Sequence, residues 1–81
     1  MPRVSSKVDI NGELVALGAA IRLHRKGIGI SQEELADLAS IDRSHMGKIE
    51  RGERNVSLLN VLRIVHALDT TLAKLSNSAG L

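Results

Sequence analysis

Residues 31–55 read SQEELADLASIDRSHMGKIERGERN, which is two short helix-like runs joined by a turn of only a few residues. An isolated helix shorter than roughly 12 to 15 residues is marginal in water, even when it is built from good helix formers. Neither run is therefore stable alone, and flanking segments must hold the two together. The second run and its end also concentrate polar and basic side chains, namely Arg43, Ser44, His45, Lys48, Arg51 and Arg54.

The side chains available for that packing are aliphatic, because the chain of 81 residues contains no Phe, Tyr or Trp. Leu, Ile, Val, Ala and Met recur at helical spacings, which favours a compact helical bundle over a sheet. We predict an all-α fold of one domain over residues 11–81. Residues 1–10 show no hydrophobic periodicity and are expected to form a flexible N-terminal arm.

Composition narrows the class of protein. The chain has no Cys, so it has neither a disulfide framework nor a thiolate metal site. Its apolar runs are far shorter than the ~20 residues that cross a bilayer, and its N-terminus lacks the apolar block of a secretory signal. We therefore expect a cytoplasmic protein that does not contact membranes. The formal net charge of +2 is only mildly basic and does not by itself indicate a nucleic-acid partner.

The first helix is predicted from Glu13 to Lys26, with Asn11 as its cap and Gly27 as its end. Leu14, Gly18 and Ile21 recur on one face of this helix. Arg25 falls on the same face, so its guanidinium should be partly buried and should require an acidic partner.

Four further helices follow from caps and periodicity. Ser31 and Glu34 form a capping box that opens the second helix, in which Leu35, Ala36 and either Leu38 or Ala39 face inward. Asp42 is placed to cap a third helix from Arg43 to Arg51. Ser57 caps a fourth helix that ends near Leu68, and Thr70 or Thr71 caps a fifth through Leu72 and Leu75.

On the third helix, Met46 and Ile49 point toward the core. The opposite side presents hydrogen-bond donors to solvent, with one bare spot at Gly47. The ordinary interpretation of such a charged stretch is a solvated face. Two helices joined by a short turn also form a helix-turn-helix, whose second helix can enter the major groove of DNA. That geometry explains why both helices are short and why the second one carries these side chains.

Residues 31–68 resemble the lambda-repressor-like, Xre-type helix-turn-helix family. They match its Ser-Gln-x-x-Leu-Ala opening, its Ile-Glu-x-Gly close and its following Ser-Leu helix. Within that family, DRSHMGKIERGERNVSL is similar to the controller proteins of restriction-modification systems. The resemblance covers roughly residues 13 to 76 and implies a compact five-helix DNA-binding domain. It implies a transcriptional regulator that acts on palindromic operators in double-stranded DNA, possessing no enzymatic activity, cofactor or small-molecule substrate.

The resemblance also implies roles for individual residues. It implies phosphate contacts from Gln32 and His45, base-edge contacts from Arg43, Ser44 and Lys48, and backbone or groove contacts from Arg54 and Asn55. It further implies that Arg25 pairs with Glu50, the acidic partner that the helical-face argument requires. One position departs from the family: Ser40 stands where the turn usually has Gly, and a non-Gly residue with positive φ costs on the order of 1 kcal/mol.

Other classes of function are less consistent with the sequence. His24, His45 and His66 lie on three different predicted helices without an i, i+4 pair, so no metal site is expected. There is no nucleophile elbow, phosphate loop or clustered acid pair, which argues against an enzyme. The main alternative is an antitoxin-type protein-interaction module that binds a partner protein and also regulates its own operon.

The C-terminal third of the chain predicts a homodimer. Apolar residues of the fourth helix, including Ile64, cover an arc of about 160°, which is wider than the ~100° stripe that one core face requires. Leu72 and Leu75 follow directly. We therefore predict a dimer interface that includes Ile64, Leu72 and Leu75, the alternative being that Leu72 and Leu75 close the core of the monomer.

Overall fold

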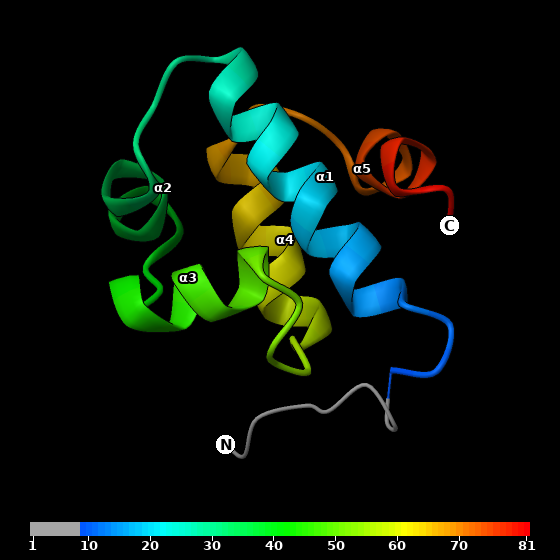
Figure 1. Ribbon diagram of the computed structural model, residues 1–81. Helices are drawn as coiled ribbons and strands as arrows, with labels where there is room; N and C mark the ends of the chain where they lie inside the picture. The colour runs from blue at the N-terminus through cyan, green and yellow to red at the C-terminus, as the bar shows by residue number, and fades with distance from the viewer. Residues whose placement is uncertain (1–8) are drawn as a thin grey trace.

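The computed structural model describes residues 9–81, and the described chain contains helices and no strands (Figure 1). The helices are α1 (Glu13–Gly27), α2 (Gln32–Ala39), α3 (Arg43–Glu50), α4 (Leu58–Ala67) and α5 (Leu72–Ala79). The predicted all-α fold is confirmed, and each predicted helix is present with ends that differ by at most a few residues.

Side-chain caps explain where four of these helices begin. The Ser31 hydroxyl accepts from the Glu34 amide at 3.0 Å while the Glu34 carboxylate accepts from the Ser31 amide at 3.0 Å, which is the predicted capping box. Asp42 caps α3, Ser57 caps α4, and Thr71 rather than Thr70 caps α5. Each cap satisfies a backbone amide that the helix itself leaves unpaired.

The start of α1 differs from the prediction. Gly12, with φ 66°, is the N-cap residue and supplies no side chain, so the assignment of the cap to Asn11 was wrong. The Asp9 carboxylate instead accepts from the amides of Leu14 at 3.1 Å and Val15 at 3.3 Å. The Asp9 carboxylate therefore caps the first turn of α1 from outside the helix. Residues 1–8 of the predicted arm lie outside the described residues.

The turn between α2 and α3 has a left-handed residue at its first position. Ser40 has φ 56° and ψ 41°, in the left-handed region that glycine usually occupies. The amide of Ser40 donates to the Asp37 carbonyl at 3.2 Å, and the amide of Ile41 donates to the Ala36 carbonyl at 2.9 Å. These bonds close α2 and direct the chain into α3 despite the cost of a non-Gly residue at this position.

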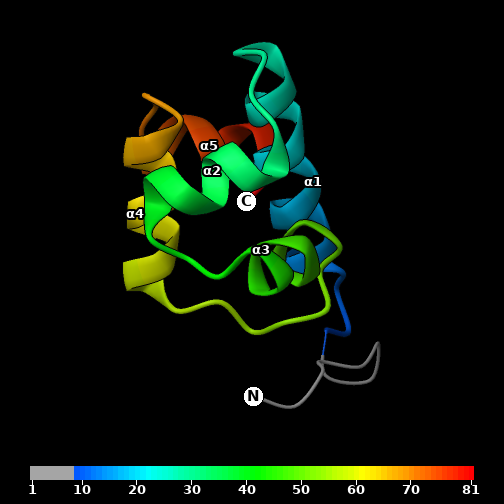
Figure 2. The ribbon, with the colours of Figure 1, turned by 90° about the vertical axis from the view of Figure 1, so that its left-hand side faces the viewer.

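The helices pack around one aliphatic core. In Figure 1, α1 crosses the molecule, α2 and α3 lie on one side and α5 on the other. Turned by 90°, the molecule shows α3 nearly end-on below α2, with α4 to one side (Figure 2). α5 packs on α1 and α4, whereas α3 packs on α1 and α2. The most deeply buried large side chains are Ile21, Leu35, Met46, Ile49, Ile64, Val65 and Leu75.

This core changes the interpretation of the C-terminal apolar residues. Ile64 and Leu75 have no exposed surface in the subunit, so their assignment to a dimer interface was wrong: a side chain enclosed by its own subunit has no surface to offer a partner. Leu72 is 37% exposed and remains available. Of the two alternatives on α2, Ala39 faces inward, because Ala39 is buried and Leu38 is 64% exposed.

A close backbone approach brings α1 against the last turn of α3. A β-carbon at Gly18 would lie 2.4 Å from the Ile49 carbonyl oxygen and 2.6 Å from the Glu50 carbonyl oxygen. Both neighbours are backbone atoms, so they cannot move aside by changing a side-chain rotamer. The absence of a side chain at Gly18 therefore sets how closely α3 approaches α1.

We predict that Gly18→Ala destabilises the protein by about 1 to 3 kcal/mol, because the methyl group forces α1 and α3 apart. Gly27→Ala is the matched control, since Gly27 ends the same helix and a β-carbon there would meet nothing within 4 Å. The control should leave stability within about 1 kcal/mol of the native value, in the stabilising direction. Urea unfolding of the three proteins measures the difference, and equal midpoints for the two variants would contradict the close packing.

Candidate nucleic-acid interface

The candidate site is built on α3, whose two sides differ in character. Met46 and Ile49 are buried against the core, with exposed fractions of 0% and 2%. Arg43 and Ser44 are exposed at the start of the helix, and His45 and Lys48 are partly exposed. The amphipathic pattern predicted from the sequence is thus present, with polar side chains directed away from the bundle.

Asp42 organises the first turn of α3. One of its carboxylate oxygens accepts from the Ser44 amide at 3.1 Å, from the Ser44 hydroxyl, and from the His45 amide at 3.4 Å. These bonds lower the pKa of Asp42, chiefly through the Ser44 hydroxyl and next through the His45 amide. Because the Ser44 hydroxyl donates its hydrogen bond to Asp42, its oxygen can only act as an acceptor toward other groups.

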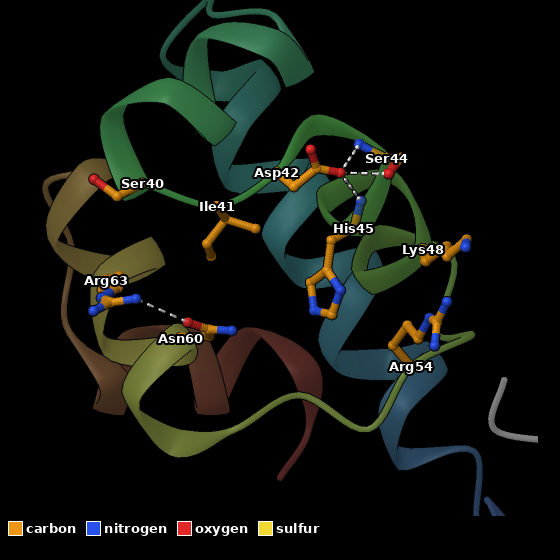
Figure 3. Close-up of a pocket in the computed structure, with 9 residues that line it drawn as sticks. All are labelled: Ser40, Ile41, Asp42, Ser44, His45, Lys48, Arg54, Asn60 and Arg63. Carbon is orange, nitrogen blue, oxygen red and sulfur yellow. Dashed lines mark hydrogen bonds between the residues drawn. The ribbon is translucent and has the colours of Figure 1, made fainter. Parts of the chain in front are cut away.

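On one side of α3 lies an open hollow of about 380 Å³, the α3–α4 hollow (Figure 3). Its walls come from the turn after α2, the exposed side of α3, the loop that follows α3, and α4. The lining side chains are Ser40, Ile41, Asp42, Ser44, His45, Lys48, Arg54, Asn60 and Arg63. Asp42 is the only carboxylate in this set, and its accepting oxygen is already used by α3, so the hollow is basic.

On the other side lies the α2–α3 hollow, of about 360 Å³, lined by Gln32, Arg43, Ser44, Gly47, Lys48 and Arg51. Ser44 and Lys48 line both hollows. The exposed side of α3 is therefore a ridge between two basic depressions.

Gly47 was expected to be a bare spot on the exposed face, but it is buried. A β-carbon there would lie 3.2 Å from the Gln32 Oε1 atom and 3.2 Å from an Arg51 guanidinium nitrogen. The glycine thus makes room for the side chain that α2 contributes, and the expectation was wrong because the helical pattern of α3 alone does not reveal what α2 places over it.

Arg54 and Asn55 follow α3 but differ in environment. The Arg54 side chain lines the α3–α4 hollow, and its Nε and Nη1 atoms are buried without a hydrogen-bond partner among the described residues. Its third nitrogen, Nη2, is not one of these buried, unpaired atoms. Asn55 is exposed and lines neither hollow. The structure thus brings six of the seven predicted DNA-binding residues to the two hollows.

Comparison with known proteins bears directly on this arrangement. The sequence profile of the helix-turn-helix family matches residues 21–75, which span α2, α3 and α4 together with parts of α1 and α5. This chain is a member of the helix-turn-helix family. The Xre-type resemblance drawn from the sequence is confirmed, and the family is one of DNA-binding regulators rather than of enzymes.

This helix-turn-helix chain is similar in sequence and structure to proteins named as control or controller proteins. Control protein C.SmaI of Serratia marcescens is 37% identical over 65 residues, which cover 80% of this chain and 77% of that protein. Control protein C.MunI of Mycoplasma sp is 39% identical over 54 residues, covering 67% and 73% of the two chains. The crystal structure of the restriction-modification controller protein C.AhdI from Aeromonas hydrophila matches with a TM-score of 0.77 at 47% identity, over 79% of this chain and 97% of that one.

Two site residues were missed by sequence reasoning. Asn60 and Arg63 of α4 line the α3–α4 hollow of this helix-turn-helix protein, and neither was among the predicted contacts. A signal existed, because they are polar residues three positions apart in an otherwise apolar helix. Among residues 9–81, no three His, Asp or Glu side chains are grouped as a metal site would require. None of the described helices has the length and apolarity to span a membrane.

A buried polar network anchors the helix-turn-helix to α1. Arg25 donates from Nε to Glu50 Oε2 at 2.8 Å and from Nη2 to Glu50 Oε1 at 3.0 Å. The Arg25 Nη1 atom donates to the Ile30 carbonyl at 3.0 Å. The side-chain amide of Gln32 donates from Nε2 to Glu50 Oε1 at 3.2 Å. The pairing of Arg25 with Glu50 is present as predicted, and Glu50 in addition fixes the first residue of α2.

We predict that Glu50→Ala destabilises the protein by roughly 3 to 5 kcal/mol, because it leaves the Arg25 charge buried without a partner. The Arg25 and Glu50 side chains are only 11% and 3% exposed. Glu33→Ala is the control: Glu33 pairs with Arg43 at 3.8 Å, the two side chains are 64% and 69% exposed, and such surface pairs contribute about 1 kcal/mol or less. Thermal unfolding compares the two variants, and coincident melting curves would show that the buried pair does not stabilise the fold.

Proposed function

We propose that this protein is a sequence-specific, DNA-binding transcriptional regulator that acts in the cytoplasm and inserts α3 into the major groove. The observation that carries the proposal is the polar ridge of α3 between two basic hollows. The major groove is about 12 Å wide and admits a helix with its side chains, which is about 10 to 12 Å across. A helix seated there has one phosphodiester backbone on each side, which matches the two hollows.

The position of each side chain supports a distinct role. Arg43 is exposed at the first position of α3, where it can donate two hydrogen bonds to the O6 and N7 atoms of guanine. Its only ion pair among the described residues is an exposed one with Glu33 at 3.8 Å, which costs little to exchange. Lys48 extends from the ridge toward base edges, and Ser44 offers its oxygen as an acceptor to an amino group of cytosine or adenine.

The residues beside the ridge suit the DNA backbone. Gln32 lies at the N-terminus of α2, where helix amides and its own side-chain amide can donate to a phosphate. His45 and Arg54 line the α3–α4 hollow on the other side. Arg54 is a cation with two covered donors that have no partner among residues 9–81, so the solvent screens its charge poorly and a phosphate at its outer edge is attracted strongly. We assign Asn55 to the groove edge from its exposed place in the same loop.

We further propose that the protein controls the expression of restriction-modification genes. The support is its similarity to proteins named as control or controller proteins of such systems. This similarity also favours a regulator over the antitoxin alternative. The operator sequence would be found by footprinting the DNA upstream of the protein's own gene.

We propose that the regulator acts as a homodimer on a palindromic operator. One short recognition helix reads too few base pairs to select a site in a genome, whereas a two-fold dimer reads two half-sites about one turn, ~34 Å, apart. Leu72 on α5 is the partly exposed apolar residue that remains for this contact. Because α5 packs on α1 and α4 while α3 packs on α1 and α2, a partner seated on α5 leaves the polar face of α3 free.

Arg43→Ala should reduce the preference for one base position, because loss of a bidentate guanine contact removes roughly 1 to 3 kcal/mol of discrimination. Gln32→Ala should weaken binding to cognate and scrambled sites alike, because a phosphate contact carries no sequence information. Fluorescence anisotropy with both duplexes separates the two effects. Arg22→Ala, an exposed arginine of α1, is the control and should bind both duplexes as the native protein does. Equal losses at both duplexes for Arg43→Ala would contradict its assignment to base edges.

Leu72→Asp should weaken dimerisation by about tenfold or more, because it places a charge in the apolar contact. Leu38→Asp is the control, since Leu38 is 64% exposed on α2, a helix that packs chiefly on α3 and α4. Leu75 is unsuitable for this test because the change would disrupt the core. Sedimentation over a micromolar concentration series measures the dimer. A native chain that stays monomeric and binds a single half-site at full affinity would contradict the proposal.

A further inference from the structure

The polar residues of α4 form a line along one side of an apolar helix. The helix reads LLNVLRIVHA, and its three polar residues, Asn60, Arg63 and His66, are spaced three apart. We call these three residues the α4 stripe. Residues three apart are neighbours on a helix surface, and all three side chains are at least partly exposed. The stripe is not used by any role assigned above.

The α4 stripe faces two adjoining depressions. Asn60 and Arg63 line the α3–α4 hollow together with His45 and Lys48 of α3. Arg63 and His66 line another open hollow of about 430 Å³, the α2–α4 hollow, whose remaining walls are Leu38, Ala39, Ser40 and Ala67. Arg63 and Ser40 border both depressions, so the surface continues from α3 along α4. In Figure 3, Asn60 and Arg63 lie across the hollow from Lys48 and Arg54.

Arg63 and Asn60 both present hydrogen-bond donors on the stripe. Arg63 donates to Asn60 Oδ1 at 3.4 Å, which occupies the amide oxygen and leaves the amide nitrogen of Asn60 as the free end. Arg63 forms no ion pair with a carboxylate of the described residues. The α2–α4 hollow contains no acidic side chain, and the α3–α4 hollow contains only Asp42. Such a surface fits a linear polyanion.

We propose that the α4 stripe binds phosphates of the DNA strand that borders α3, beyond the contacts already assigned. The inference rests on the proposed function. Asn60 and His66 are six residues apart, which is about 9 Å along the helix axis. Successive phosphates of one strand rise by about 3.4 Å, so the stripe is long enough to meet at least two of them. The planar guanidinium of Arg63 matches two phosphate oxygens at once.

An acidic protein segment is the other polyanion of comparable chemistry. The shared hollow favours DNA, because Asn60 and Arg63 lie in the same depression as the α3 side chains that enter the major groove. A strand bordering α3 passes through this depression, whereas a protein partner would compete with DNA for it.

The test measures binding of the full chain to its footprinted operator and to a scrambled duplex over a salt series. Arg63→Ala should weaken both duplexes equally, by roughly threefold to tenfold, and should reduce the slope of log K against log salt by about 0.9 for each lost phosphate contact. Arg22→Ala should change neither quantity, because Arg22 is an exposed arginine of α1 that lines none of the three hollows. Arg63→Lys keeps the charge and should retain most of the slope.

A second variant tests whether a loss of DNA binding in Arg63→Ala comes from a change in folding. Asn60→Asp replaces the outward donor by a carboxylate next to Arg63, near the N-terminus of α4, where negative charge is favourable. It should keep the native melting temperature and weaken both duplexes at least as much as Arg63→Ala.

The possible outcomes distinguish a failure of the proposed function from a failure of this inference alone. A native chain that binds no DNA would overturn the proposed function together with this inference. Specific binding by the native chain, with affinity and salt slope unchanged in Arg63→Ala and Asn60→Asp, would overturn this inference alone. Loss of binding to poly-L-glutamate in those variants, with DNA binding intact, would overturn it in favour of an acidic protein partner.

Discussion

The buried contact between Arg25 and Glu50 determines where α3 stands, and the functional surface depends on that position. The bidentate pair fixes the last turn of α3 to α1, and the missing side chain at Gly18 lets the two backbones meet there. Glu50 also accepts from Gln32, so the same carboxylate sets the start of α2. One acidic side chain therefore orients both short helices, neither of which would be stable alone.

The opposite end of α3 is positioned by local chemistry instead of by burial. Ser40 holds the left-handed turn, and Asp42 collects the free amides of the first turn of α3. The residues proposed to contact bases follow directly from this cap. The helix is thus held firmly by the core at its end and by its own cap at its start, while its exposed side is left to polar side chains.

The parts of the structure that were predictable from sequence are those with local causes. Caps such as Ser31 and Ser57 and the spacing of apolar residues determine the helices, and the helical position of Arg25 required an acidic partner. Properties that depend on how separate helices meet were not predictable. The burial of Gly47 under Gln32 and the enclosure of Ile64 and Leu75 both depend on residues of other helices. The capping of α1 by Asp9 is local but was also missed, because Asp9 lies before the N-cap residue and outside the expected helix.

The sequence likewise indicated which helix would carry the site but not its borders. The hollows beside α3 exist because α2 and α4 stand on either side of it, and a pattern within one helix does not encode that placement. Asn60 and Arg63 therefore join the surface through tertiary structure, although their spacing in an apolar helix was visible.

The proposed contact of Arg54 with a phosphate would link the stability of the protein to its occupancy by DNA. Two nitrogens of this guanidinium are covered and have no acceptor among residues 9–81, so the free protein carries a partly desolvated charge. A phosphate at the outer edge of the group would offset that cost only in the complex. Any ligand that binds the folded state alone shifts the folding equilibrium toward it. Molecules bound at an operator would then resist unfolding and proteolysis better than free ones, so the lifetime of the regulator would follow the number of sites it occupies.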